Sequence, residues 1–242
     1  MTGTILNCAG IIIGGVVGLV WRKGLRPTTE AYVRIFIAAA LVFYGLRLVW
    51  TSLISPNNSI WRILGELLVV VLSLTLGKIL GHLVRLQKLS NSLGQFARER
   101  MEKAGKGSAD KFNDGFLTCT ALFCAAPLAI VGAVQDGLTG YYYPLVAKAF
   151  IEGFAAFGFV RIFGWGAVIS FLPVLAFQGT ISLSMQHLEP FLRVRDLVEP
   201  IQAVGGFMIF SVALVMLELK KLELADYLPS LIMAPLITGL IW

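Results

Sequence analysis

MTGTILNCAGIIIGGVVGLVW, residues 1–21, is the stretch that decides the fold, because it contains no charged side chain. A helix needs roughly 20 apolar residues to cross the hydrocarbon core of a membrane. Three further uncharged runs follow, at residues 116–135, 162–186 and 200–217. Because a helix in a soluble protein has no reason to be apolar on every face, these runs predict membrane-spanning helices.

The composition of the whole chain agrees with this interpretation. Of its 242 residues, 57% are hydrophobic and 14% are charged, whereas about 25% are charged in a soluble domain. A secretory signal peptide has its positive charges before the apolar stretch, but here Arg22 and Lys23 follow it. We therefore expect an all-α, polytopic transmembrane helix bundle in the lipid bilayer, with residues 1–242 forming a single transmembrane domain.

Eight apolar segments are candidates for spanning helices, at residues 3–22, 31–54, 61–84, 112–135, 144–164, 165–187, 198–218 and 227–242. Two of them leave alternatives open. The fifth contains Lys148, Glu152 and Arg161, so it is either a span or a shorter, re-entrant piece. The eighth is short, so it either spans with distortion or lies partly buried in the bundle. The expected bundle therefore has about 7–8 helices.

Basic residues gather on one side if all eight segments cross the membrane. Lys and Arg collect in cytoplasmic loops, so this side is expected to face inward. The two termini would then both lie outside. The net charge of +6 is explained by this placement and gives no reason to expect a nucleic-acid partner. The inward-facing set is Arg22, Lys23, Arg26, Arg34, Arg85, Lys88, Arg98, Arg100, Lys103, Lys106, Lys111, Arg161, Lys220 and Lys221.

The one long polar stretch, residues 85–111, predicts a basic amphipathic helix and linker at the inner surface. Leu86, Leu89, Leu93 and Phe96 recur at helical spacing, and basic residues occupy the other faces. Two readings stay open. The helix lies on the anionic inner leaflet or meets a partner, or it is a solvated connector with a modest apolar stripe.

Glycines recur every four residues in two of the predicted spans. They are Gly10, Gly14 and Gly18 in the first, and Gly77 and Gly81 in the third. Glycine at this spacing lets two helix backbones approach closely, which is how membrane helices gain packing energy. Close helix packing is the simpler reading, pore lining the alternative, and homo-oligomer formation through these helices a further expectation.

Two similar stretches in the second half indicate interrupted helices. One is PLAIVGAVQDGLTG at residues 127–140, and the other is PVLAFQGTISL at residues 173–183. Each has a proline within an apolar segment, followed by a glutamine near a glycine. Proline removes a backbone hydrogen bond, and in lipid the freed groups need partners from protein or water. Paired interrupted helices are a sequence indicator of a binding site in transporter folds.

Six polar side chains are the candidates for binding a solute. We expect Gln178 to face inward, and Gln135 and Asp136 to converge with it on one polar cavity, although Gln135 and Asp136 alternatively begin an outer loop. Lys148 and Glu152 lie four residues apart and can pair on one helix face. That pair is either structural or part of transport, and Asn7 is either a cap or interhelical hydrogen bond or a ligand.

Enzyme motifs are absent from the sequence. It contains no G-x-S-x-G nucleophile elbow, no H-E-x-x-H and no Walker loop. Cys8, Cys119 and Cys124 lie in apolar runs without metal-ligand spacing, and the two histidines are far apart in the sequence. We therefore expect no catalytic site, no metal site and no cofactor.

The ordered motifs of the chain resemble those of the DUF554 family of bacterial membrane proteins. The resemblance rests on TILNCAGIIIGGVVGL, LFCAAPLAIVGAVQDG, PVLAFQGTISL, AVGGF and YLPSLIMAP. The sequence departs from the family pattern at Glu152, where Asp is more common, and at residues 125–127, where the family often has a glycine and no proline. The resemblance implies a multi-pass protein of the bacterial inner membrane, loosely described as a transporter, and it brings no substrate.

Together these observations favour a secondary transporter or channel for a small solute or ion. The alternative is a non-transporting membrane protein that assembles with, or regulates, a partner through its basic inner helix.

Overall fold

The computed structural model of the protein describes residues 1–21, 24, 26–54, 60–105 and 110–241. These residues form eleven α-helices and one 3-10 helix, and no strand is found among them, so the expected all-α fold is confirmed. The elements are α1 (Thr2–Val20), α2 (Pro27–Leu53), α3 (Ile60–Val84), α4 (Leu86–Gly105), α5 (Lys111–Ala125), α6 (Pro127–Thr139), α7 (Tyr143–Phe163), α8 (Trp165–Ile169), α9 (Phe171–Val194), α10 (Val198–Met216), η1 (Leu224–Tyr227) and α11 (Ser230–Ile241).

Six helical segments are long and apolar enough to cross a membrane, and the bent pair α5–α6 adds a seventh. The six include α1, α2, α3 and α10, the continuous stretch of α8 and α9, and the stretch of η1 and α11. Large apolar side chains cover the outside of the described structure: Val20 is 81% exposed and Leu240 86%. A surface of this kind is stable against lipid and unfavourable against water. The protein is therefore a membrane protein.

α7 is the eighth long segment, and it is not among the six. It has 21 residues, but Lys148, Glu152 and Arg161 lower its hydropathy. Two of these charged residues, Lys148 and Glu152, are buried inside the bundle and do not face outward. The segment therefore forms one helix at nearly the predicted residues, and two of its charged side chains lie in the interior of the bundle.

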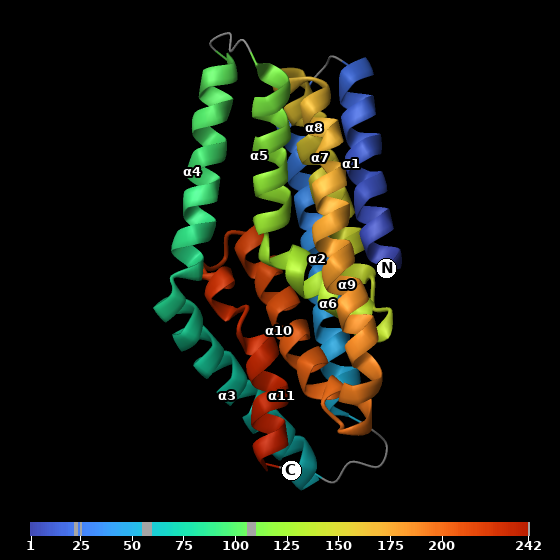
Figure 1. The fold of residues 1–242 in the computed structure, drawn as a ribbon, viewed down its shortest axis with the longest axis vertical. Helices are drawn as coiled ribbons and strands as arrows, with labels where there is room; N and C mark the ends of the chain where they lie inside the picture. The colour runs from blue at the N-terminus through green and yellow to red at the C-terminus, as the bar shows by residue number, and fades with distance from the viewer. Residues whose placement is uncertain (22–23, 25, 55–59, 106–109, 242) are drawn as a thin grey trace.

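The first of the two expected helix breaks lies where the sequence predicted it. α5 ends at Ala125 and α6 begins at Pro127, with a bend of 60° between them. Pro127 occupies the first helical position of α6, where its missing N–H would have had no partner anyway. Figure 1 shows this break near the middle of the molecule's long axis, with α4 and α5 above it and α3 and α11 below.

The second break differs from the expectation. α9 begins at Phe171 and continues without interruption through Gln178 and Gly179. Regular α-helix is interrupted for one residue, Ser170, between α8 and α9, although Trp165–Val194 together remain one candidate span. Pro173 therefore lies in the first turn of a helix, where proline removes no hydrogen bond. Gln178 and Gly179 thus lie on a regular helix. Gln135 and Gly137 also lie on a regular helix, α6, and the interruption of that segment is at Pro127.

The glycines of α1 pack against α7, as the four-residue spacing predicted. A Cβ atom added at Gly10 would lie 2.5 Å from the carbonyl oxygen of Ala149, and one at Gly18 would lie 2.5 Å from that of Phe157. Gly14 faces Gly153 in the same way. The sequence numbers rise together, so α1 and α7 run in the same direction.

Two other helix pairs run in opposite directions. Between α2 and α10, Arg34 pairs with Glu218 at one end and Val49 contacts Gly206 toward the other. In α3, Gly77 faces Ser230 of α11 and Gly81 faces Asp226 of η1. These directions, and the parallel α1 and α7, are those that eight successive crossings require. The glycines of α1 thus pack against α7, and those of α3 against α11 and η1, while homo-oligomer formation through these helices stays a prediction.

The polar stretch forms α4, which folds back along α5. Ala97 and Ala104 are buried on the side of α4 that packs inward, and Arg100 forms an ion pair with Asp114 of α5. Its Lys88, Arg98 and Lys103 are exposed. The linker positions Lys106 and Ser108, like Arg22 and Lys23 of the first loop, lie outside the described residues.

Candidate functional site

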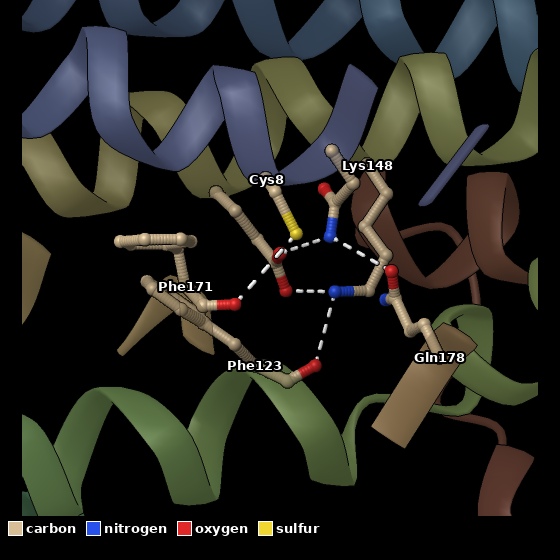
Figure 2. A network of polar contacts seen from close by, with 7 residues as sticks. Cys8, Phe123, Lys148, Phe171 and Gln178 are labelled. Carbon is tan, nitrogen blue, oxygen red and sulfur yellow. Dashed lines mark hydrogen bonds and ion pairs between the residues drawn. The ribbon is translucent and has the colours of Figure 1, made fainter. Parts of the chain in front are cut away.

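Four polar side chains meet in the interior of the bundle, between α1, α7 and α9. Asn7 comes from α1, Lys148 and Glu152 from α7, and Gln178 from α9, and each is at most 3% exposed. Figure 2 shows the ammonium group of Lys148 directed toward the carbonyl group of Phe123, with Gln178 in the same network of polar contacts. We call Asn7, Lys148, Glu152 and Gln178 the polar centre. The sequence analysis named all four, and their binding of a solute stays a prediction.

Lys148 has two hydrogen-bond acceptors, and one of them is a backbone carbonyl that a proline leaves free. Its Nζ atom forms an ion pair with Glu152, one turn along α7, and it also donates to the carbonyl oxygen of Phe123 at 3.0 Å. In a continuous helix that carbonyl would accept from the N–H of residue 127, but Pro127 has none. The residue that breaks the α5–α6 segment therefore also frees an acceptor for the buried ammonium group.

The orientation of the Asn7 amide follows from the charge of Glu152. Asn7 Nδ2 donates to Glu152 Oε2 at 2.7 Å and to Gln178 Oε1 at 3.2 Å. An ionised carboxylate only accepts hydrogen bonds, so the NH₂ group of Asn7 must face it. Gln178 must then present its oxygen to Asn7 and direct its own NH₂ group elsewhere. In the described structure, Asn7 Oδ1 and Gln178 Nε2 are both buried and have no hydrogen-bond partner.

Asp136 lies next to the polar centre and is also buried. Its Oδ2 atom accepts from the backbone N–H of Gly3 at 3.1 Å and lies 3.5 Å from the hydroxyl of Ser182. The amino group of Met1 is 3.1 Å from the same oxygen. Asp136 Oδ1 has no hydrogen-bond partner among the described residues.

One helical turn separates the contacts of Asp136 from the polar centre. On α1, Gly3 reaches Asp136 and Asn7 reaches Glu152. On α9, Ser182 approaches Asp136 and Gln178 approaches Asn7. Both pairs of positions are four residues apart in the sequence, so the two carboxylates are contacted at levels about 5–6 Å apart along the same two helices. Asp136 and Gln178 therefore share one polar region.

Gln135 does not join them, which corrects the expectation that it converges with Asp136 and Gln178. Its Nε2 atom donates to the carbonyl oxygen of Ile201 on α10 at 3.2 Å, and its side chain packs on Gly205. Successive residues on a helix point about 100° apart. Once Asp136 faces α1 and α9, its neighbour must face a different helix.

Tyrosines fix the loop that follows α6. The hydroxyl of Tyr141 donates to the carbonyl oxygen of Tyr44 at 2.7 Å, and the ring of Tyr143 stacks on that of Tyr44. Burial raises the pKa of Tyr141 to about 12. Its hydroxyl therefore keeps its proton at neutral pH and remains a donor, which holds the end of α6 that carries Asp136.

The polar centre is closed from the surface. An apolar groove of about 830 Å³ follows α1 and α7, and its lining includes Gly10, Gly14, Ala149 and Gly153. None of the four polar-centre residues lines that groove. A solute would therefore reach the polar centre only after the surrounding helices move.

One group of side chains could hold a metal ion. His82 of α3 lies near Glu223 and Asp226, and their ligand atoms all lie within 4.8 Å of one another. Asp226 already accepts from the backbone N–H of Gln87 at 2.7 Å. No spacing in the sequence indicates this group, because His82 and Asp226 are far apart in the chain. It lies on α3 and η1, away from the helices of the polar centre.

The chain matches a family model over nearly its whole length. Residues 2–239 match the model described as "Protein of unknown function (DUF554)". The chain belongs to the DUF554 family. This confirms the resemblance inferred from the ordered motifs, although residues 125–127 and Glu152 depart from the pattern expected for DUF554 proteins.

Two relatives cover almost the same length. The chain is 28% identical over 237 residues to "Uncharacterized membrane protein YdfK" of Bacillus subtilis (strain 168), covering 98% of this chain and 95% of the relative. It is 25% identical over 233 residues to "Uncharacterized protein YqgA" of Escherichia coli (strain K12), covering 96% and 94%. No solved structure matches the chain.

Proposed function

We propose that this DUF554 protein is a secondary transporter or channel for a small solute or ion. The translocation site is the polar centre together with Asp136. The observation that carries the proposal is the burial of Lys148 and Glu152, with Asn7 and Gln178, among apolar helices. Ionisable residues inside a membrane bundle are costly to bury, and they usually mark solute or ion pathways.

The break between α5 and α6 supports the same proposal. Its freed carbonyl group contacts Lys148 directly, so a movement at the break changes the contacts of the site. Interrupted helices in transporters place backbone groups at the solute site, and alternating access moves the surrounding helices about that site. The unpaired amide atoms of Asn7 and Gln178 are available to a solute once the helices part.

The proposed setting is the bacterial inner membrane, with both termini outside and α4 on the inner side. The support is the distribution of Lys and Arg among the loops. Because most of the charged side chains of α4 are exposed while its alanines pack on α5, α4 would present its basic face to the anionic inner leaflet. A non-transporting assembly or regulatory role is the second candidate, and the same exposed basic face favours it.

Flux through purified protein in liposomes tests the proposal. We expect wild-type protein, without any partner, to move at least one member of a panel of ions and small solutes across the bilayer. Gln178→Leu and Asp136→Asn should each abolish that flux while the protein still elutes as a folded species. Gln95→Leu, the same change on an exposed face of α4, is the control and should transport normally. Normal transport by both site variants would show that these residues are structural.

A further inference from the structure

We propose that the solute is a small anion bearing a carboxylate, carried together with one proton. Glu152 takes the proton, and Lys148 and Gln178 hold the carboxylate. This inference rests on the proposed transport function and deepens it. It starts from Gln178 Nε2, a fully buried NH₂ group without a partner in the described structure. Its side chain is linked to Lys148 through Asn7 and Glu152 (Figure 2).

The free NH₂ group is held in place by its neighbours. Glu152 fixes the amide of Asn7, and Asn7 in turn occupies the oxygen of Gln178. The group of Gln178 that has no partner is therefore its donor NH₂ group, and its oxygen is already bonded to Asn7. A carboxylate oxygen is a strong acceptor for such a group and for an ammonium group. Asn7 acts here as a positioning residue, because it touches Gln178 and Glu152 and need not touch the solute.

Charge balance couples the proton to the anion. In the closed state Lys148 and Glu152 neutralise one another. A proton added to Glu152 alone leaves the buried ammonium without a counter-ion, and an anion added alone places two negative charges against one positive charge. Either state is expensive in a low-dielectric interior. When both enter, Glu152 is neutral and the anion replaces it as the partner of Lys148, so the site keeps zero net charge.

The surrounding groups allow this exchange. The thiol of Cys8 on α1 donates to the carbonyl oxygen of Phe171, and Gln178 on α9 is an uncharged amide. Asp136 on α6, one turn away, already has the Gly3 N–H and the Met1 amino group as partners. A protonated Glu152 still accepts from Asn7 Nδ2 through Oε2, with its new proton on Oε1. The arrangement that leaves Gln178 Nε2 without a partner is therefore the same whether Glu152 is ionised or protonated.

A cationic solute fits less well. It would have to replace Lys148 as the partner of Glu152, but the Lys148 side chain is 2% exposed and is tied to the carbonyl oxygen of Phe123. The displaced ammonium would remain buried beside the incoming cation. Repulsion between the Lys148 ammonium and a cation beside it in the low-dielectric interior would strongly oppose binding.

Proton uptake on binding tests the inference without any transport assay. Purified protein in weakly buffered detergent is titrated with glycolate, a small carboxylate, while an indicator dye records pH. We expect about one proton taken up per glycolate bound at neutral pH. Glycolamide, which has the same shape without the charge, should neither bind nor take up protons. Glu66→Gln, a change at a carboxyl group of α3 outside the polar centre, should behave as wild type.

Three variants separate the proposed roles of Glu152 in taking the proton and of Gln178 and Lys148 in holding the carboxylate. Glu152→Gln should bind glycolate without proton uptake, and in liposomes it should exchange labelled glycolate but lose glycolate-driven acidification of the lumen. Gln178→Leu should weaken glycolate binding by roughly tenfold. Lys148→Met and Glu152→Gln each leave one buried charge without its partner, so each single variant is assayed only as protein that elutes as a folded species. The double variant Lys148→Met, Glu152→Gln removes both charges and should not bind glycolate.

Several results would overturn the inference. They are glycolate binding without proton uptake in the wild type, unchanged proton uptake in Glu152→Gln, or preference for glycolamide or a cation. If the wild type transports glycolamide or a cation in liposomes, the transport proposal stands and only the proposed solute class is wrong. If the wild type moves no member of the panel, yet takes up a proton with glycolate, transport fails and the binding site stands.

Discussion

At the residue scale, the effect of Lys148 on the free energy of unfolding depends on whether Glu152 remains beside it. Lys148 and Glu152 are 2% and 3% exposed, so neither charge is screened by water. The ion pair stabilises the fold little more than two apolar side chains of similar size would. The attraction between its charges only offsets the cost of removing both charges from water. Removal of one partner is different, since it leaves the other charge buried and uncompensated.

We therefore expect Lys148→Met to lower the free energy of unfolding by about 3–5 kcal/mol. The double variant Lys148→Met, Glu152→Leu should recover most of that loss, because no charge remains in the interior. Denaturant unfolding in mixed detergent micelles measures both. Equal destabilisation of the single and double variants would show that the pair acts through packing and not through charge.

The candidate residues could be predicted individually, but their arrangement could not. A polar residue in an apolar run is visible in the sequence, which is why Asn7, Lys148, Glu152 and Gln178 were all identified. The contacts of Asn7 cross 145 and 171 positions of the chain, and no spacing rule reaches that far. Gln135 was grouped with Asp136 because they are adjacent, although adjacent residues on a helix face different neighbours.

At the element scale, the seam between α1 and α7 depends on residues without side chains. We expect Gly14→Leu to force the two backbones apart and to lower the apparent melting temperature in detergent by roughly 5 °C or more. Gly158→Leu is the matched control, because a Cβ at that glycine of α7 meets nothing within 4 Å. Equal melting of Gly14→Leu and the wild type would contradict close packing at this seam.

The break between α5 and α6 allows a second test. Pro127→Ala restores an N–H that can bond to the carbonyl oxygen of Phe123, in competition with Lys148. We expect the 60° bend to straighten and flux to fall by about tenfold or more. Spin-label distances between positions on α5 and α6 report the bend. A variant that keeps both the wild-type distance and the wild-type flux would show that Pro127 is not the cause of the break.

Element positions were predictable because each apolar run needs one helix to hide its backbone from lipid. The structure places the ends of most segments within a few residues of the prediction. Pro173 was interpreted wrongly because its effect depends on where its helix begins. Deep in a helix it would remove a hydrogen bond, but in the first turn of α9 it removes none.

At the scale of the whole molecule, the distribution of Lys and Arg predicts how the protein is oriented across the membrane. The charge distribution predicts that α4 and the linker after it face inward, and that the turn between α9 and α10 faces outward. In a background without native cysteines, an impermeant maleimide added to intact cells should label Asp196→Cys and should not label Ser108→Cys. Permeabilised cells, in which both should react, are the control. The reverse pattern in intact cells would contradict the orientation with both termini outside.

The buried amide of Asn7 also has a consequence for how the protein is made. Its partner Glu152 is synthesised 145 residues later, and ribosomes add about 5–20 residues per second. For roughly 7–30 s the first helix therefore has a polar side chain with no partner from its own chain. During that interval α1 must be sheltered by the insertion machinery or wait at the membrane interface. Its final docking is set by translation of the second half, so α1, although made first, takes its place late in assembly.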